Sequence, residues 1–202
     1  MARLPDHPVD PLFVDRWSPR SFSGEAVPDA VLASAFEAAR WAPSASNAQP
    51  WRFLVARRDD AHWQDFVGLL APRNALWAAS GAALIVILSQ RQVERGGKIV
   101  DNVSHSFDAG AAWTNFAHQA LLLGWHTHGI GGFDREAARV RLEVPEDYTI
   151  ETMVALGRQG TLETLHADFH ANESPNGRRP IEETVFAGRL GLPAFAREQD
   201  AA

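Results

Sequence analysis

The feature that most constrains this chain is the run AALIVILS at residues 82–89, which carries apolar side chains at consecutive positions. A strand with one solvated face alternates apolar and polar side chains, so this run predicts a strand that is covered on both faces. A run of this length is far too short to span a bilayer. The sequence around it must therefore supply a sheet and helices that pack on both of its sides.

The remaining patterns supply those elements. An apolar stripe of helical period covers 28–41, where Pro28 suits the helix start, and a longer stripe covers 108–123, where Gly124 suits a C-terminal cap. Trp51, Phe53 and Val55 alternate in a predicted strand over 51–57. Further helices are expected at 60–70, 72–79 and 134–143, and further strands at 126–130 and 152–157. This order predicts an α+β fold in which helices layer a sheet.

Composition narrows the function classes. The chain has 202 residues, of which 46% are hydrophobic and 22% charged, as expected for a single domain over 1–202. Its net charge of −6 argues against a nucleic-acid partner, and any phosphate site must be built from arginine because Lys98 is the only lysine. The absence of cysteine excludes disulfides and thiol chemistry. The N-terminus lacks an apolar signal segment, so we expect a cytoplasmic protein without a membrane partner.

Three segments fall outside the predicted core. Residues 1–14 are rich in proline and are expected to form an extended arm. Residues 90–106 are polar and contain glycine, which is typical of either a loop or a mobile lid. Residues 160–202 contain too few apolar side chains for a core of their own, so we expect a C-terminal extension that wraps another surface, such as a second subunit.

Candidate anion ligands lie near both ends. In the stretch DRWSPRSF, Arg16, Ser18 and Arg20 alternate, so an extended backbone points two guanidinium groups and a hydroxyl the same way. Paired arginines bind phosphate well, although a solvated charged strand has the same pattern. The pair Arg178–Arg179 is a weaker signal of the same kind.

Two other patterns have competing interpretations. The glycines of GIGGF (129–133) either let a ligand approach the backbone or simply bend the chain at a strand end. His126 and His128 share one strand face, but no third metal ligand is near them in the sequence. His166 and His170 fit a solvated surface pair better than a metal site.

The stretch WAPSASNAQPWRF (41–53) holds more small hydrogen-bonding groups than a helix-to-strand turn requires. With its neighbours it carries a resemblance. The chain contains, in order, RWSPRSF, APSASNAQPWRF, DAGAAWTNFAHQALLLGW, GIGGFD, VPEDYTIETMVALG and RRPIEE. In order and spacing these motifs resemble those of nitroreductase-like FMN oxidoreductases, over residues 15 to 188.

The resemblance implies a nitroreductase-like fold, in which helices flank a mostly antiparallel sheet, and an intertwined homodimer with FMN at the subunit interface. It also implies a cofactor site. The first motif would hold the FMN phosphate and ribityl chain, the second would line the isoalloxazine of the partner, and the glycines would approach flavin N5. These implied cofactor-binding residues are Arg16, Trp17, Ser18, Arg20, Pro43, Ser44, Ala45, Asn47, Gln49, Gly131, Gly132, Arg178 and Arg179.

The chain departs from the family pattern at two places. Ala45 stands where a second serine is common, so a contact there must come from the backbone. Arg158 and Gln159 stand where Tyr-Pro commonly follows the last strand.

The resemblance implies that FMN carries the redox chemistry, so no catalytic side chain and no metal are expected. NAD(P)H would donate hydride, and a nitroaromatic, quinone or similar small electron-poor acceptor would then receive it. Two alternatives remain open. One is an FMN-dependent dehydrogenase, dehalogenase or flavin-destructase-type enzyme on the same fold, and the other is a non-catalytic flavin-binding protein.

Overall fold

The computed structural model describes residues 3–195, which form two compact units. The larger unit is Arg16–Ser174, and the smaller one joins the described parts of both chain ends, residues 3–15 and 175–195. Residues 11–15 are helical, so the predicted arm is not extended throughout. The predicted extension differs from the structure in its start, because residues 160–174 belong to the larger unit. Leu165 and Phe169 are buried in its core and explain this boundary.

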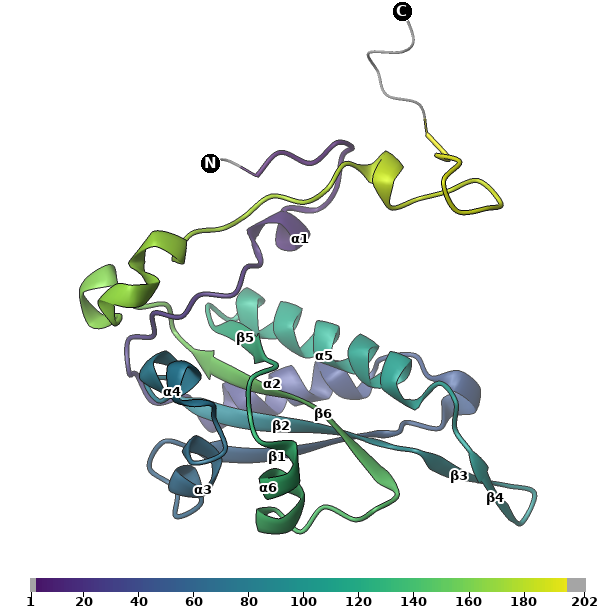
Figure 1. The fold of residues 1–202 in the computed structure, drawn as a ribbon, viewed down its shortest axis with the longest axis horizontal. Helices are drawn as coiled ribbons and strands as arrows, with labels where there is room; N and C mark the ends of the chain where they lie inside the picture. The colour runs from purple at the N-terminus through teal and green to yellow at the C-terminus, as the bar shows by residue number, and fades with distance from the viewer. Residues whose placement is uncertain (1–2, 196–202) are drawn as a thin grey trace, which may run out of the picture. The chain divides into compact units, whose positions relative to one another are not determined.

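The larger unit is built on a four-stranded antiparallel sheet (Figure 1). The strand order is β1-β2-β6-β5, with β1 at Trp51–Arg57, β2 at Ala83–Gln90, β6 at Tyr148–Gly157 and β5 at His126–Ile130. All three pairings are antiparallel, which agrees with the predicted sheet. Strand β6 is longer than predicted, because residues 148–150 pair with the end of β2 beyond a bulge at Ile87/Leu88.

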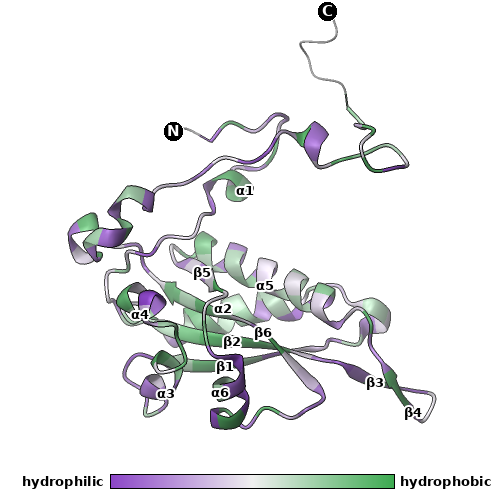
Figure 2. Ribbon diagram, viewed as in Figure 1, coloured by the Kyte–Doolittle hydropathy of each residue, from purple (hydrophilic) through white to green (hydrophobic). Residues whose placement is uncertain are grey.

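Strand β2 is covered on both faces, as its sequence predicts. Ile85 and Ile87 pack in one core cluster with helices α2 (Asp29–Arg40) and α5 (His105–Leu122). Leu84, Val86 and Leu88 pack in a second cluster with α3 (Trp63–Val67), α4 (Pro72–Ala78) and α6 (Arg135–Arg141). Hydrophobic residues follow β2 through the middle of the sheet (Figure 2).

Helix boundaries confirm most of the predictions, with two exceptions. Gly124 has φ +78° directly after the C-cap of α5, as predicted. The helix predicted over 60–70 is shorter in the structure, Trp63–Val67, with turns on both sides of it, and Leu70 forms a bridge with Phe133. Residues 90–106 are not the simple loop that is one of the two expectations. They contain a hairpin of β3 (Gln92–Arg95) and β4 (Lys98–Asp101), and α5 begins at His105.

The smaller unit holds a short helix and irregular segments. Helix α1 (Pro11–Asp15) lies in the N-terminal part, and a 3-10 turn (Ile181–Glu183) follows Pro180 in the C-terminal part. The two parts are joined by side chains: Arg3 donates to the carbonyls of Val14 and Asn176, at 2.6 and 2.8 Å. In residues 3–195, no helix is both long and apolar enough to cross a membrane.

Candidate cofactor site

The segment Arg16–Ser21 is held in place by contacts from distant parts of the chain. One carboxylate oxygen of Glu173 accepts hydrogen bonds from the backbone N–H groups of Arg20 and Ser21, each at 2.8 Å. The Ser21 hydroxyl donates to the carbonyl of Thr161 at 2.5 Å. Nδ1 of His128, on β5, lies 3.0 Å from the carbonyl oxygen of Pro19. The backbone of the segment is therefore fixed independently of any ligand.

Two of the three polar side chains in this segment contact each other, and the third packs near aromatic rings. A guanidinium nitrogen of Arg16 donates to the Ser18 hydroxyl at 3.3 Å. The Arg20 guanidinium lies 6.0 Å from the Trp77 ring and 5.7 Å from the Phe169 ring. Arg16, Ser18 and Arg20 are all half-buried, and Trp17 between them is half-buried too. Two guanidinium groups and a hydroxyl on a rigid, partly desolvated backbone suit a phosphate group.

Two histidines adjoin the arginines and are neutral at neutral pH. The pKa of His128 is lowered to about 4, chiefly by burial, while the hydrogen bond to Pro19 opposes this shift and the nearby charges of Arg20 and Arg16 add to it. Burial and the charge of Arg16 also lower the pKa of His118, on α5. A neutral His128 donates through Nδ1–H to the Pro19 carbonyl, while its ring packs 4.4 Å from Trp77. Neither histidine was predicted as a site residue.

The loop after α2 is locally strained. Ser46, Asn47 and Gln49 have φ of 53°, 55° and 49°. Non-glycine residues in this left-handed region cost on the order of 1 kcal/mol each, and such strain concentrates at functional sites. The loop is held from inside, because the Ser44 hydroxyl accepts from Gln49 N at 3.0 Å and Ala45 N donates to buried Asp108 at 3.1 Å.

The outer side of this loop is open. Pro43, Asn47 and Gln49 are exposed. Gln49 makes a side-chain hydrogen bond only within the loop, from its amide nitrogen to the Asn47 carbonyl at 3.1 Å. The loop thus presents amide donors and acceptors on a backbone that is already ordered. Ala45 has no side-chain hydroxyl where the family commonly has a serine, and its backbone N–H donates to Asp108.

The two glycines after β5 have different surroundings. The Gly132 carbonyl accepts from the Asn74 side chain at 2.9 Å and from Ala71 N at 3.1 Å, and a Cβ at residue 132 would lie 2.6 Å from the Asn74 amide nitrogen. A Cβ at Gly131 would meet nothing within 4 Å. Gly132 is therefore required for packing, whereas Gly131 leaves open space beside the backbone.

The predicted site residues form separate groups within the larger unit. Helix α5 lies between the loop and the Arg16–Ser21 segment. Asp108, near the start of this helix, contacts Ala45, and the charge of Arg16 contributes to the lowered pKa of His118 ten residues later. Ten residues of α-helix span about 15 Å. The loop is next to Trp51, which pairs with Ser89, and the Arg16–Ser21 segment is next to Phe22, which bridges Gln159 at the opposite end of the sheet. One chain therefore does not bring the two groups together.

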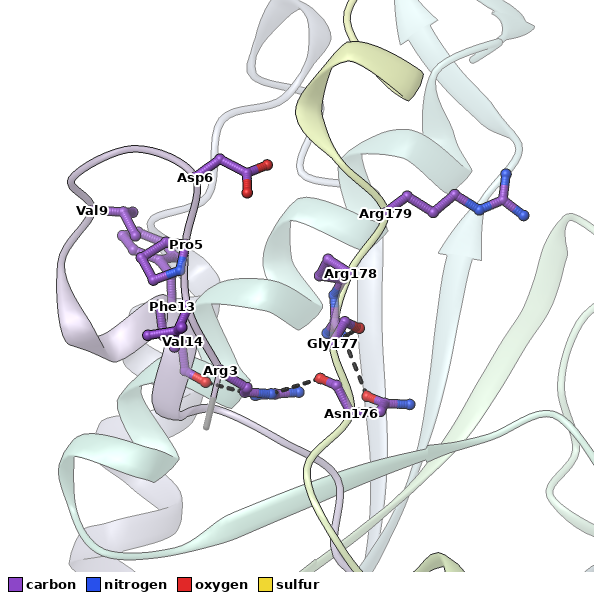
Figure 3. A pocket seen from close by; sticks show the side chains of 11 residues that line it. Arg3, Pro5, Asp6, Val9, Phe13, Val14, Asn176, Gly177, Arg178 and Arg179 are labelled. Atoms are coloured by element: carbon purple, nitrogen blue, oxygen red, sulfur yellow. Dashed lines mark hydrogen bonds between the residues drawn. The ribbon is translucent and has the colours of Figure 1, made fainter. Parts of the chain in front are cut away.

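Arg178 and Arg179 lie in the smaller unit, where they line a cavity of about 460 Å³ (Figure 3). Its walls also include Arg3, Val9 and Phe13. Arg178 donates to the Asn176 side chain and to the Gly177 carbonyl, while Arg179 extends away from the apolar wall. The nearby charge of Arg178 and burial both lower the pKa of Arg3, burial having the larger effect.

The second departure from the family pattern has a structural use. Arg158 pairs with Glu25 at 2.9 Å, donates to the Gly124 carbonyl at 3.4 Å and lies 5.0 Å over the buried Trp125 ring. It therefore joins the end of α5 to the segment that follows Phe22. In the part of the chain that the structure describes, no three histidine or carboxylate side chains gather as metal ligands. His170 instead contacts the Leu165 carbonyl at 2.8 Å.

Comparison with known proteins identifies relatives of this chain. The model of the nitroreductase family matches residues 14–69, which include the Arg16–Ser21 segment and the strained loop. An NADH dehydrogenase of Thermus thermophilus is 30% identical over 92% of this chain and 98% of its own length. A crystal structure described as an oxidoreductase containing FMN is 41% identical, covers 94% of this chain and 96% of its own, and superposes with a TM-score of 0.91.

A more distant structure, a nitroreductase family protein from Streptococcus pneumoniae, shares the fold at 19% identity and a TM-score of 0.68, over 87% of this chain and 98% of its own. The similarity to the Thermus enzyme extends over nearly the whole length of both proteins. The chain belongs to the nitroreductase family.

Proposed function

We propose that this protein is an FMN-dependent oxidoreductase that oxidises NAD(P)H and reduces nitroaromatic, quinone or similar electron-poor acceptors. The observation that carries the proposal is the ordered Arg16–Ser21 segment, in which Arg16 contacts Ser18 and the backbone at Arg20 is held by Glu173. Its donor set suits a phosphomonoester. The names of the relatives support it as well, one being an NADH dehydrogenase and another an oxidoreductase containing FMN.

The remaining groups suit the rest of that cofactor. The strained loop offers amide groups from Asn47 and Gln49 to a ring edge that carries several donors and acceptors. Gly131 leaves room for a flat ring to approach the backbone. FMN supplies the hydride chemistry when it is bound, and the protein supplies orientation and electrostatics. The positive charges of Arg16 and Arg20 also favour a cofactor that gains negative charge on reduction.

A homodimer accounts for the separation of the two groups in one chain. In this arrangement the loop of one subunit completes the cofactor site built on the Arg16–Ser21 segment of the other. Exposed apolar side chains on the larger unit support a second copy as the covering partner: Val103 is 93% exposed, Phe107 83% and Leu122 65%, before, within and at the end of α5. Apolar groups of this size gather at protein interfaces when they are not isolated.

The test is anaerobic reduction of the purified protein after reconstitution with FMN. We expect a stoichiometric yellow complex whose flavin absorbance bleaches on addition of NADPH or NADH and returns when a quinone or nitroaromatic compound is added. Failure to retain FMN rejects the proposed cofactor. Retained FMN that neither nucleotide reduces supports a flavin-binding protein instead.

The oligomeric state is tested separately by light scattering of the FMN-loaded protein. We expect the mass of a dimer, and an FMN-loaded monomer at micromolar concentration rejects the two-subunit site.

A further inference from the structure

The β3–β4 hairpin carries two cations at its tip. The connecting turn, Gly96–Gly97, has φ of +58° and +75°, the two positive values of a type I′ turn. Directly before and after it stand Arg95 and Lys98, which face each other in the antiparallel register. Lys98 is the only lysine of the chain, whose net charge is −6.

The two cations share one side of the hairpin. Because strand side chains alternate, the register places Arg95 and Lys98 on the side of Val93 and Val100, while Glu94 lies on the other side. Like charges that face each other across a strand pair are destabilising. Within residues 3–195, neither Arg95 nor Lys98 makes an ion pair. An isolated two-stranded hairpin is itself only marginally stable, so an anion bound between the cations would order this tip.

The base of the hairpin adjoins the strained loop. A cavity of about 300 Å³ is lined by Ala48 and Pro50 from the loop and, from the hairpin, by Gln92, Glu94 and Ile99 on one side and by Val93 on the side of the two cations. Gln90 N donates to the Pro50 carbonyl at 2.9 Å and joins the two segments directly. The hairpin extends from there, away from the sheet (Figure 1). Its tip is three residues, or about 10 Å, beyond its base.

We propose that the tip of the β3–β4 hairpin binds the phosphates of the nicotinamide dinucleotide, with Arg95 and Lys98 as the anion ligands. The inference rests on the proposed function, because it assumes a flavin beside the Asn47–Gln49 loop. A nicotinamide stacked on that flavin would leave its diphosphate outside the ring pocket, and the base of the hairpin adjoins the same loop. Arg95 offers a planar fork for two phosphate oxygens, Lys98 adds a compact charge, and nothing lies within 4 Å of a Cβ built at either glycine.

The test compares two hydride donors on the FMN-loaded protein, NADPH and N-benzyl-1,4-dihydronicotinamide, which has no phosphate. The variant is R95Q/K98Q. We expect it to raise KM for NADPH and Kd for NADP⁺, measured by calorimetry, by about tenfold or more, because each charge-assisted contact to phosphate is worth roughly that factor. The salt dependence of NADP⁺ binding should fall in parallel. Flavin reduction by the benzyl compound should keep its wild-type rate.

The matched control is R57Q/R189Q, which removes the same charge from β1 and from the exposed Arg189 of the smaller unit and should leave NADP⁺ binding unchanged. The exchange R95K/K98R, which keeps both charges, should retain most of the affinity. Equal NADP⁺ affinities in wild type and R95Q/K98Q overturn the inference and leave the proposed function standing. If neither donor reduces the wild-type flavin, the proposed function fails and the inference fails with it.

Discussion

Replacement of Arg20 by alanine should weaken FMN binding far more than replacement of Arg57. Both changes remove one positive charge, so the comparison separates position from charge. Arg20 is half-buried, its guanidinium lies between the Trp77 and Phe169 rings, and no carboxylate pairs with it among residues 3–195. Arg57 instead pairs with Asp29, whose side chain is 86% exposed.

The magnitude follows from these surroundings. A hydrogen bond to a charged group contributes roughly 1.5–3 kcal/mol. Loss of one such bond to a phosphate therefore weakens binding by about 10- to 150-fold. An exposed ion pair such as Arg57–Asp29 contributes only about 0–1 kcal/mol to folding and nothing to a ligand held elsewhere. Arg58 is not a suitable control, because its guanidinium donates to the Ser80 and Gly81 carbonyls and its loss would disturb folding.

The assay is titration of each apo-variant with FMN while flavin fluorescence is followed. Circular dichroism of both apo-variants should match the wild type, because neither arginine belongs to the apolar core. Bound FMN should raise the melting temperature of R57A more than that of R20A at one FMN concentration. Equal FMN affinities in the two variants would refute the reasoning and make the Arg16–Ser21 segment a solvated strand.

Three further outcomes follow from the same contacts. Glu173→Gln should weaken FMN binding about tenfold without loss of the fold, because a neutral amide oxygen replaces the carboxylate oxygen that accepts from two backbone N–H groups. Fluorescence titration with FMN measures the change in affinity. His128 has a pKa of about 4 in the folded protein against 6.5 in the unfolded chain, so its contribution to the free energy of unfolding is complete above pH 6.5 and falls by up to about 3 kcal/mol toward pH 4. Urea denaturation at pH 7 and pH 5 should show this loss of stability. His128→Asn should make the difference between the two pH values smaller. Gly132→Ala should lower the melting temperature by displacing Asn74, whereas Gly131→Ala should leave it unchanged and weaken FMN binding.

The sequence predicts those parts of the fold in which the local pattern of apolar and polar residues has only one interpretation. The run over 82–89 is apolar on both faces, and the structure buries it between two core clusters. The hairpin within 90–106 was not predicted, because strands of four residues, QVER and KIVD, are too short and too polar for periodicity to register. The pattern that indicates this hairpin is the Gly96–Gly97 pair, which is typical of a two-residue turn, with Val93 and Val100 three residues before and after it.

The candidate site was predictable to the extent that its residues are close in sequence. Alternation predicts that Arg16, Ser18 and Arg20 lie on one side of an extended segment, and the structure joins the first two by a hydrogen bond. The groups that position this segment come from far along the chain, as Glu173 is 153 residues from Arg20 and His128 is 109 residues from Pro19. No local pattern connects residues at such separations, so only the three-dimensional structure could identify them.

The position of Glu173 explains how an arginine can be held beside a carboxylate and still keep its charge for a ligand. Oε1 of Glu173 is occupied by two backbone N–H groups, and no ion pair forms between Glu173 and Arg20. The guanidinium is held instead by two aromatic rings, which fix its position through their electron-rich faces without neutralising it. The carboxylate thus orders the backbone while the rings order the side chain. An ion pair would fix Arg20 equally well, but an incoming phosphate would then have to displace the carboxylate.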